Sequence, residues 1–294
     1  MNRFVTARTL ALVRDLELAA RIAVDGTMLG RHTSRRAGAG LEFSQYRSYQ
    51  PGDDPRRIDW KLLGRSDRYF VREAEAETSL TVRLLLDATG SMAHEEDGVT
   101  KLNYARFLTA ALALLAHRQG DAVGLYVLGS GDVTPYLPRR EPQHLHRLLH
   151  ALEGVTPAGG WPEWNRLERA LAPGTARGIT VLIGDLHERA DEIRAAARRL
   201  AGARHDVVCF QILGERERAF AYAGAVTLEE LETGRRVDLD ADQARPTATA
   251  GMDAGLRQLR RDLEERGAAL VECHLAEPFE GPLRDYLTRR QRLP

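Results

Sequence analysis

Residues 83–92 read RLLLDATGSM, an apolar run that ends on Asp87 and is followed by hydroxyl side chains at Thr89 and Ser91. A second apolar run, TVLIGD, ends on Asp185. Two carboxylates and two hydroxyls form an all-oxygen set, which suits Mg²⁺ because this ion prefers hard oxygen ligands and keeps several of its waters. A coordination position left to water can be filled by a carboxylate of another protein. The pattern therefore predicts a site that binds a protein partner and transforms no substrate.

A simpler interpretation of the same residues needs no metal. Thr89 and Ser91 follow a strand-like run, and their hydroxyls could cap the next helix by accepting hydrogen bonds from its free amides. Against this, an aspartate at the end of a buried strand is unfavourable without a partner, and the pattern occurs at both Asp87 and Asp185. We favour the metal site and keep capping as the alternative.

An enzymatic interpretation is also open. The stretch DATGS resembles the nucleophile loop of haloacid-dehalogenase-type phosphotransferases, in which an aspartate that ends the first strand is phosphorylated. The resemblance implies Asp87 as the nucleophile and Gly184-Asp185 as the later Mg²⁺-holding pair. Such enzymes also use a lysine to neutralise the transferring phosphate. No lysine occurs from Asn103 to Gly184, which argues against phosphoryl transfer.

Alternating strands and helices would position these side chains. Five strand-like apolar runs and one shorter run are expected at 81–87, 122–129, 178–185, 206–213, 270–275 and 133–137. Helices are expected at 101–119, 143–152, 166–171, 191–201, 252–266 and 282–290. This alternation predicts a Rossmann-like α/β fold, a doubly wound and mostly parallel sheet with helices on both faces. In such a sheet, side chains at the carboxyl ends of strands beside the switch point share one edge, which would bring Asp87 and Asp185 together.

Two further segments differ from this pattern. Residues 225–240 alternate on either side of Thr233-Gly234 and predict a hairpin. At the N-terminus, an amphipathic helix over 8–24 precedes a glycine-rich basic loop, a turn at 51–55 and a short strand near 68–72. We therefore divide the chain into an N-terminal segment, residues 1–76, and an α/β domain, residues 77–294.

The composition excludes several classes of protein. The formal net charge is +0 and the pI is about 7.2, so no global field attracts nucleic acid or a membrane surface. No stretch reaches 18 uninterrupted apolar residues, and charged residues interrupt every apolar run near the N-terminus, which predicts neither a membrane span nor a signal peptide. There is no glycine-rich loop ending in Gly-Lys-Ser/Thr. We expect a cytoplasmic protein.

A long segment ahead of the α/β domain resembles a known bacterial family. Glu42-Phe43, Tyr46-Arg47, Tyr49, Pro51-Gly52-Asp53-Asp54 and Arg56-Arg57-Ile58-Asp59-Trp60-Lys61 are similar to the signature of domain-of-unknown-function family 58. The upstream GRHTSRRAGAG and the later LLLDATGSM, LEELETG and EPFEGPLRDYLTRR follow in the family's order, so the resemblance covers nearly the whole chain. It implies a von Willebrand factor A-like domain that works with a MoxR-type AAA+ ATPase in a chaperone-like or assembly role.

The resemblance also implies a metal-ion-dependent adhesion site for Mg²⁺, Mn²⁺ or Ca²⁺. Asp87, Thr89 and Ser91 match its first motif, with threonine in place of the usual serine, and Asp185 matches the later acid. A threonine is expected near AGGWPEWNRL, where Trp161 and neighbouring residues stand instead, and only Thr156 lies close by. The site would therefore bind metal weakly, or be a vestigial scaffold.

The Asp-Asp-Pro-Arg-Arg-Ile-Asp-Trp run has two interpretations. Its acids and arginines can satisfy one another, while Ile58 and Trp60 would lie on the same face of a strand and pack inward. Alternatively, the run is a docking surface for the ATPase. The structural interpretation is preferred.

Overall fold

The computed structural model describes residues 16–18, 20–21, 24, 43–49, 58, 60–66, 68–74, 80–172, 178–186, 195–196, 199–200, 206–231 and 233–290. The chain forms two compact units. The larger unit comprises residues 1–30 and 79–294, and the smaller comprises residues 31–78. The N-terminal segment is thus shared between them, because Leu16, Ala20 and Val24 are buried in the core of the larger unit.

The smaller unit contains two antiparallel strands, β1 (Phe43–Ser48) and β2 (Phe70–Ala74), and one helix, α3 (Trp60–Ser66). Ile58 is buried, whereas Trp60 opens α3 and is 62% exposed. The expectation that both side chains pack inward from a strand was therefore wrong for Trp60. The physical reason is that the chain turns into a helix at Trp60, where residues two apart no longer share a face.

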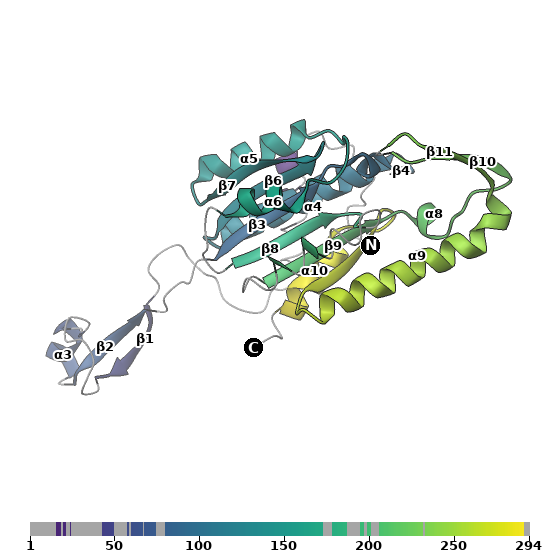
Figure 1. Ribbon diagram of the computed structural model, residues 1–294. Coiled ribbons are helices and arrows are strands. Elements are labelled where there is room, and N and C mark those ends of the chain that lie inside the picture. Colours follow the sequence, from purple (N-terminus) through teal and green to yellow (C-terminus); the bar gives the residue numbers. More distant parts are fainter. Residues whose placement is uncertain are drawn as a thin grey trace. The chain divides into compact units, whose positions relative to one another are not determined.

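A six-stranded sheet forms the centre of the larger unit (Figure 1). In spatial order its strands are β12 (Ala269–His274), β9 (Asp206–Leu213), β8 (Gly178–Gly184), β3 (Thr81–Asp87), β6 (Ala122–Gly129) and β7 (Asp132–Arg139). The first five are parallel, and β7 pairs antiparallel with β6 at one edge. After β3 the chain builds outward on one side through β6 and β7, then returns to build β8, β9 and β12 on the other. The switch point therefore lies between β3 and β8.

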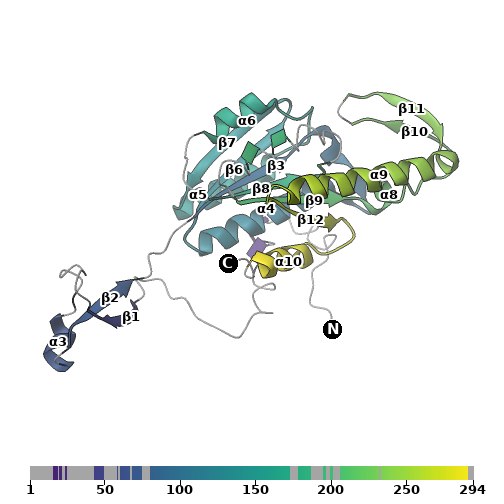
Figure 2. The same ribbon diagram turned by 60° about the horizontal axis from the view of Figure 1, so that its bottom comes forward.

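Helices cover both faces of this sheet (Figure 2). On one face lie α4 (Lys101–Arg118), α5 (Pro142–Gly154) and α10 (Glu280–Arg290), which bury leucine and alanine side chains against the alternate residues Leu84 and Leu86 of β3. On the other face lie α6 (Trp164–Leu171) and α9 (Ala241–Glu264), packed around Leu85. Leu84, Leu85 and Leu86 are all fully buried, as expected for a strand covered on both sides. The predicted fold class is confirmed.

A hairpin of β10 (Ala225–Glu229) and β11 (Arg236–Asp240) extends beyond the sheet together with the first half of α9 (Figures 1 and 2). Its turn contains Gly234 at φ 71°, as the hairpin prediction requires. Helix α9 begins at residue 241, not at 252 as expected. The Asp240 side chain caps it by accepting hydrogen bonds from the amides of Asp242 and Gln243, at 3.0 and 3.1 Å, and Pro246 is tolerated inside the helix.

Two short elements follow β3 and complete this end of the sheet. The 3-10 helix η2 (Gly90–Ala93) is followed by a small hairpin of β4 (Glu95–Glu96) and β5 (Val99–Thr100), which leads into α4. A four-residue helix, α8 (Glu215–Arg218), follows β9 at the same end. None of the described helices is both long and apolar enough to cross a membrane.

Candidate metal site at the carboxyl edge of the sheet

Asp87 and Asp185 lie at the ends of the neighbouring parallel strands β3 and β8. Asp87 is the last residue of β3, Asp185 follows the last residue of β8, and both are almost fully buried, at 2% and 3% exposure. The contact between the two strand ends depends on Gly184. A Cβ atom at this position would lie 2.5 Å from Asp87 Cβ and 2.7 Å from its Oδ2. Glycine therefore allows the Asp87 carboxylate to lie directly against the end of β8.

The two hydroxyl residues of the motif lie in the loop after β3. The Thr89 amide donates a hydrogen bond of 2.9 Å to Asp87 Oδ1, and the Thr89 and Ser91 hydroxyl oxygens are 3.0 Å apart. Both residues are buried. Thr89 occupies the cap position of η2, but its side chain makes no capping hydrogen bond. The capping interpretation is therefore wrong for Thr89, whose hydroxyl is directed to Ser91.

The backbone around Asp185 is fixed by its neighbours. Gln211 of β9 is completely buried, and its Nε2 donates a hydrogen bond of 3.0 Å to the Asp185 carbonyl. Leu186 adopts φ 58°, a conformation that is unfavourable for a residue other than glycine, and its side chain is completely buried in the second core cluster. The end of β8 is thus held by a hydrogen bond and by packing.

Sequence reasoning did not identify Lys101, which forms the principal electrostatic contact of this edge. Lys101 is the first residue of α4, and its side chain is only 1% exposed. Its ammonium lies 3.4 Å from Asp185 Oδ2 and 2.7 Å from Glu217 Oε2 of α8. Burial disfavours the charged form, but these two carboxylates outweigh burial and raise the pKa of Lys101 above its usual value.

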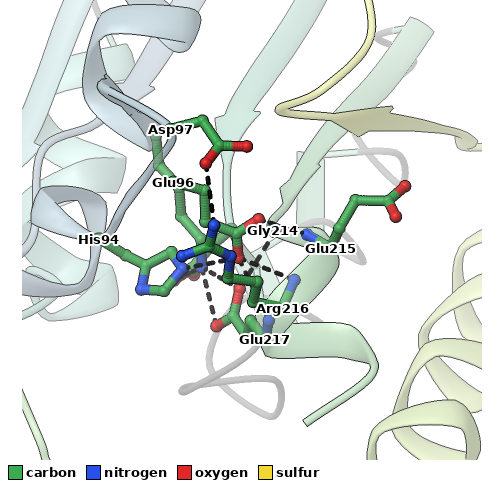
Figure 3. A network of polar contacts seen from close by, with 9 residues as sticks. His94, Glu96, Asp97, Gly214, Glu215, Arg216 and Glu217 are labelled. Atoms are coloured by element: carbon green, nitrogen blue, oxygen red, sulfur yellow. Dashed lines mark hydrogen bonds and ion pairs between the residues drawn. The ribbon is translucent and has the colours of Figure 1, made fainter. Parts of the chain in front are cut away.

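A second network holds α8 against the β4–β5 hairpin (Figure 3). The Glu96 carboxylate accepts hydrogen bonds from the amides of Glu215, Arg216 and Glu217, at 2.8, 3.0 and 3.2 Å. His94 Nε2 lies 3.1 Å from Glu96 Oε1. Burial opposes ionisation of Glu96, but the hydrogen bonds from His94 and the three amides together lower its pKa. The network fixes the backbone that carries Glu217.

The loop between α5 and α6 does not supply the expected threonine to the metal motif. Its residues that hydrogen-bond to the β3 loop are Ala158, whose amide donates to the Ala88 carbonyl at 2.9 Å, and Gly159, whose carbonyl accepts from Gly90 at 2.8 Å. Neither carries a side-chain oxygen. Thr156 instead lines a cavity of about 560 Å³ between β6, β7 and α5, and Trp161 is buried in the second core cluster.

The donor set fits a divalent cation of the magnesium type. The candidate ligands supply oxygen atoms only, from Asp87, Asp185, Thr89 and Ser91. Three carboxylates, those of Asp87, Asp185 and Glu217, carry more charge than the single ammonium of Lys101. Within the described residues, no three His, Cys, Asp or Glu side chains gather as a group that could hold a metal ion, so an ion at this edge would have the two aspartates and the two hydroxyls as its protein ligands. A hard ion that takes few protein ligands matches this chemistry.

The phosphotransferase interpretation needs a correction and remains disfavoured. The interval that lacks lysine begins just after Lys101, whose ammonium does reach this edge, so the absence of a lysine no longer argues against phosphoryl transfer. However, that ammonium is buried and already paired with Asp185 and Glu217.

The strand order, the antiparallel edge strand and the Asp-x-Thr-x-Ser loop at the switch point define a von Willebrand factor A-like domain. The chain belongs to the family described as "Protein of unknown function DUF58", which matches residues 45–257. The uncharacterized proteins Rv1480 of Mycobacterium tuberculosis and Mb1516 of Mycobacterium bovis are each 27% identical to it over 289 residues, covering 96% of this chain and 90% of theirs.

Solved structures of similar fold include two with sequence identities of 14% and 11%. BatB from Bacteroides thetaiotaomicron matches 73% of this chain and 100% of its own, with a TM-score of 0.46. The SpRpn10 VWA domain matches 70% of this chain and 94% of its own, with a TM-score of 0.40.

Proposed function

We propose that this protein is a non-enzymatic protein-interaction module that binds an acidic side chain of a partner through a divalent cation. Asp87, Thr89, Ser91 and Asp185 would hold the ion at the carboxyl edge of the sheet. When bound, the cation would supply a positive charge that attracts a carboxylate of the partner. The observation that carries the proposal is the approach of Asp87 to Gly184, which joins both acidic strand ends at the switch point.

The chemistry of these residues favours binding over catalysis. The Thr89 and Ser91 hydroxyls contact each other. Lys101 is already bound by two carboxylates, and His94 is paired with Glu96. A general acid or base must be able to reach a proton of the substrate. The Lys101 ammonium, which is held between Asp185 and Glu217, does not meet this requirement.

Thermal unfolding with and without divalent cation tests the metal site. A ligand present at a hundred times its dissociation constant stabilises the folded state by about 2.7 kcal/mol. Wild type should therefore melt at a higher temperature in Mg²⁺ or Mn²⁺, and Asp87→Asn should not. Asp206→Ala is a matched control, because this exposed aspartate begins β9 at the opposite edge of the sheet. An identical response of wild type and Asp87→Asn would refute the metal site.

For the partner, we propose a MoxR-type AAA+ ATPase, on the basis of the family resemblance. A pull-down with the ATPase encoded by the same genome, at controlled Mg²⁺, tests this. Capture should be lost in EDTA and in the Asp87→Asn variant but retained in Asp206→Ala. Capture that is equal in all four samples would mean that the two proteins meet at another surface.

A further inference from the structure

The Lys101 ammonium is shared unequally between two carboxylates from different elements. It lies 2.7 and 2.9 Å from the two oxygens of Glu217, but 3.4 Å from Asp185 Oδ2. Of these two acids, Asp185 belongs to the proposed metal site, whereas Glu217 belongs to α8. The same positive charge therefore faces a residue that would hold the cation and one that would not.

Glu217 cannot readily follow the ammonium if Lys101 moves toward Asp185. Its own amide is bound by the Glu96 carboxylate, together with the amides of Glu215 and Arg216 (Figure 3). Glu96 is itself buried and hydrogen-bonded to His94. The backbone of Glu217 is thus held in place, and its carboxylate, which also accepts a hydrogen bond of 3.4 Å from the Gly214 amide, draws the ammonium away from Asp185.

We propose that Lys101 sets the affinity of the metal site by competing with the cation for Asp185, and that Glu217 weakens this competition. The inference rests on the proposed metal site and adds a residue outside its ligand set. Lys101 opposes the binding of any cation at Asp185, since two positive charges beside one carboxylate repel each other.

Substitutions of Lys101 and of Glu217 should change the affinity for the metal in opposite directions. Lys101→Met removes the competitor and should tighten Mn²⁺ binding, whereas Glu217→Gln releases the ammonium to Asp185 and should weaken it. Each change should be on the order of tenfold, within the range of about 5- to 150-fold that is typical of coupled sites. Isothermal titration of the purified full chain with Mn²⁺ measures both affinities. Glu229→Gln, in the β10–β11 hairpin, controls for the loss of one negative charge.

A double variant separates competition through Lys101 from the direct field of Glu217. If Lys101 mediates the effect, Glu217→Gln should leave the affinity unchanged in the Lys101→Met background. A weakening by the same factor in both backgrounds, or an affinity of Lys101→Met equal to wild type, would overturn the inference while the metal site stands. No Mn²⁺ binding by wild type would instead refute the proposed function itself.

Lys101→Met leaves two carboxylates without their ammonium and could fail to fold, so a measurement on the unaltered protein is needed as well. The chain has only two lysines, Lys61 and Lys101. Labelling lysine with ¹³C at Cε therefore gives two side-chain signals, of which Lys61 is the internal control. Saturating Mg²⁺ should shift the Lys101 signal and leave that of Lys61 in place. An unchanged Lys101 signal at saturating Mg²⁺ would overturn the competition.

Discussion

The carboxylate of Asp87 lies against Gly184 so closely that a methyl group on that glycine would be 2.7 Å from Asp87 Oδ2. Because Gly184 has no side chain, the ends of β3 and β8, which are far apart in the sequence, can lie in contact. This contact lies at the switch point of a doubly wound sheet, which is where ligands bind in sheets of this kind.

Gly184→Ala should therefore destabilise the protein and abolish its response to divalent cations. The added Cβ must displace Asp87, since neither strand end can move within a packed sheet, and overpacking of this kind typically costs about 1–3 kcal/mol. Urea unfolding with and without Mg²⁺ measures both effects. Gly251→Ala in α9 is the control: a Cβ there meets no atom within 4 Å, so that variant should be as stable as wild type or more so.

Asp87→Ala and Asp87→Asn should differ in stability. Removing one of two clustered acids relieves repulsion, which alone would leave the fold intact in either variant. However, Asp87 Oδ1 accepts the buried amide of Thr89, and alanine leaves that amide without its acceptor. Asp87→Ala should be less stable than Asp87→Asn by about 1–3 kcal/mol. Equal midpoints in urea would show that this hydrogen bond contributes nothing net.

Much of the fold and the four oxygen-bearing residues could be predicted from sequence because their signals are local. The apolar runs that end at Asp87 and Asp185 predict the two strands, and they place both acids at the carboxyl edge of the sheet without knowledge of distant contacts. Lys101 and Glu217 could not be found in this way, because they are 116 positions apart and meet only through the packing of α4 and α8. The opening of α3 at Trp60 was missed because an alternating charged run is compatible with either a strand or a turn into a helix.

Trp60→Ala should consequently have little effect on stability. A buried indole would cost about 3–5 kcal/mol on truncation, but Trp60 is 62% exposed, and exposed substitutions usually change stability by less than about 0.5 kcal/mol. Chemical unfolding of the full chain measures the difference. A loss of several kcal/mol would restore the structural interpretation of the signature, whereas reduced capture of the ATPase at unchanged stability would support the docking surface.

The stabilisation by Glu96 should depend on pH. Its pKa is lower in the folded protein than the usual 4.5, so its contribution is fully present above pH 4.5 and is lost as the pH falls through the lowered value. Glu96→Gln should destabilise the protein at pH 7 by about 1–3 kcal/mol, because a neutral amide oxygen replaces a carboxylate that accepts three amides. The difference should shrink below pH 4.5. A difference independent of pH would mean that the contacts, not the charge, stabilise α8.

Glu280 should show the opposite dependence. It is buried at the start of α10, its Oε2 has no hydrogen-bond partner among the described residues, and burial raises its pKa above the usual 4.5. The protonated form is therefore favoured by folding, which stabilises the protein below pH 4.5 and is lost as the pH rises through the elevated value. Glu280→Gln should raise stability at pH 7 by about 1 kcal/mol, since it removes a charge that burial disfavours. The gain should vanish in acid, where wild type carries no charge at this position. If Glu280→Gln is instead less stable than wild type at pH 7, the Glu280 carboxylate is solvated or paired in solution.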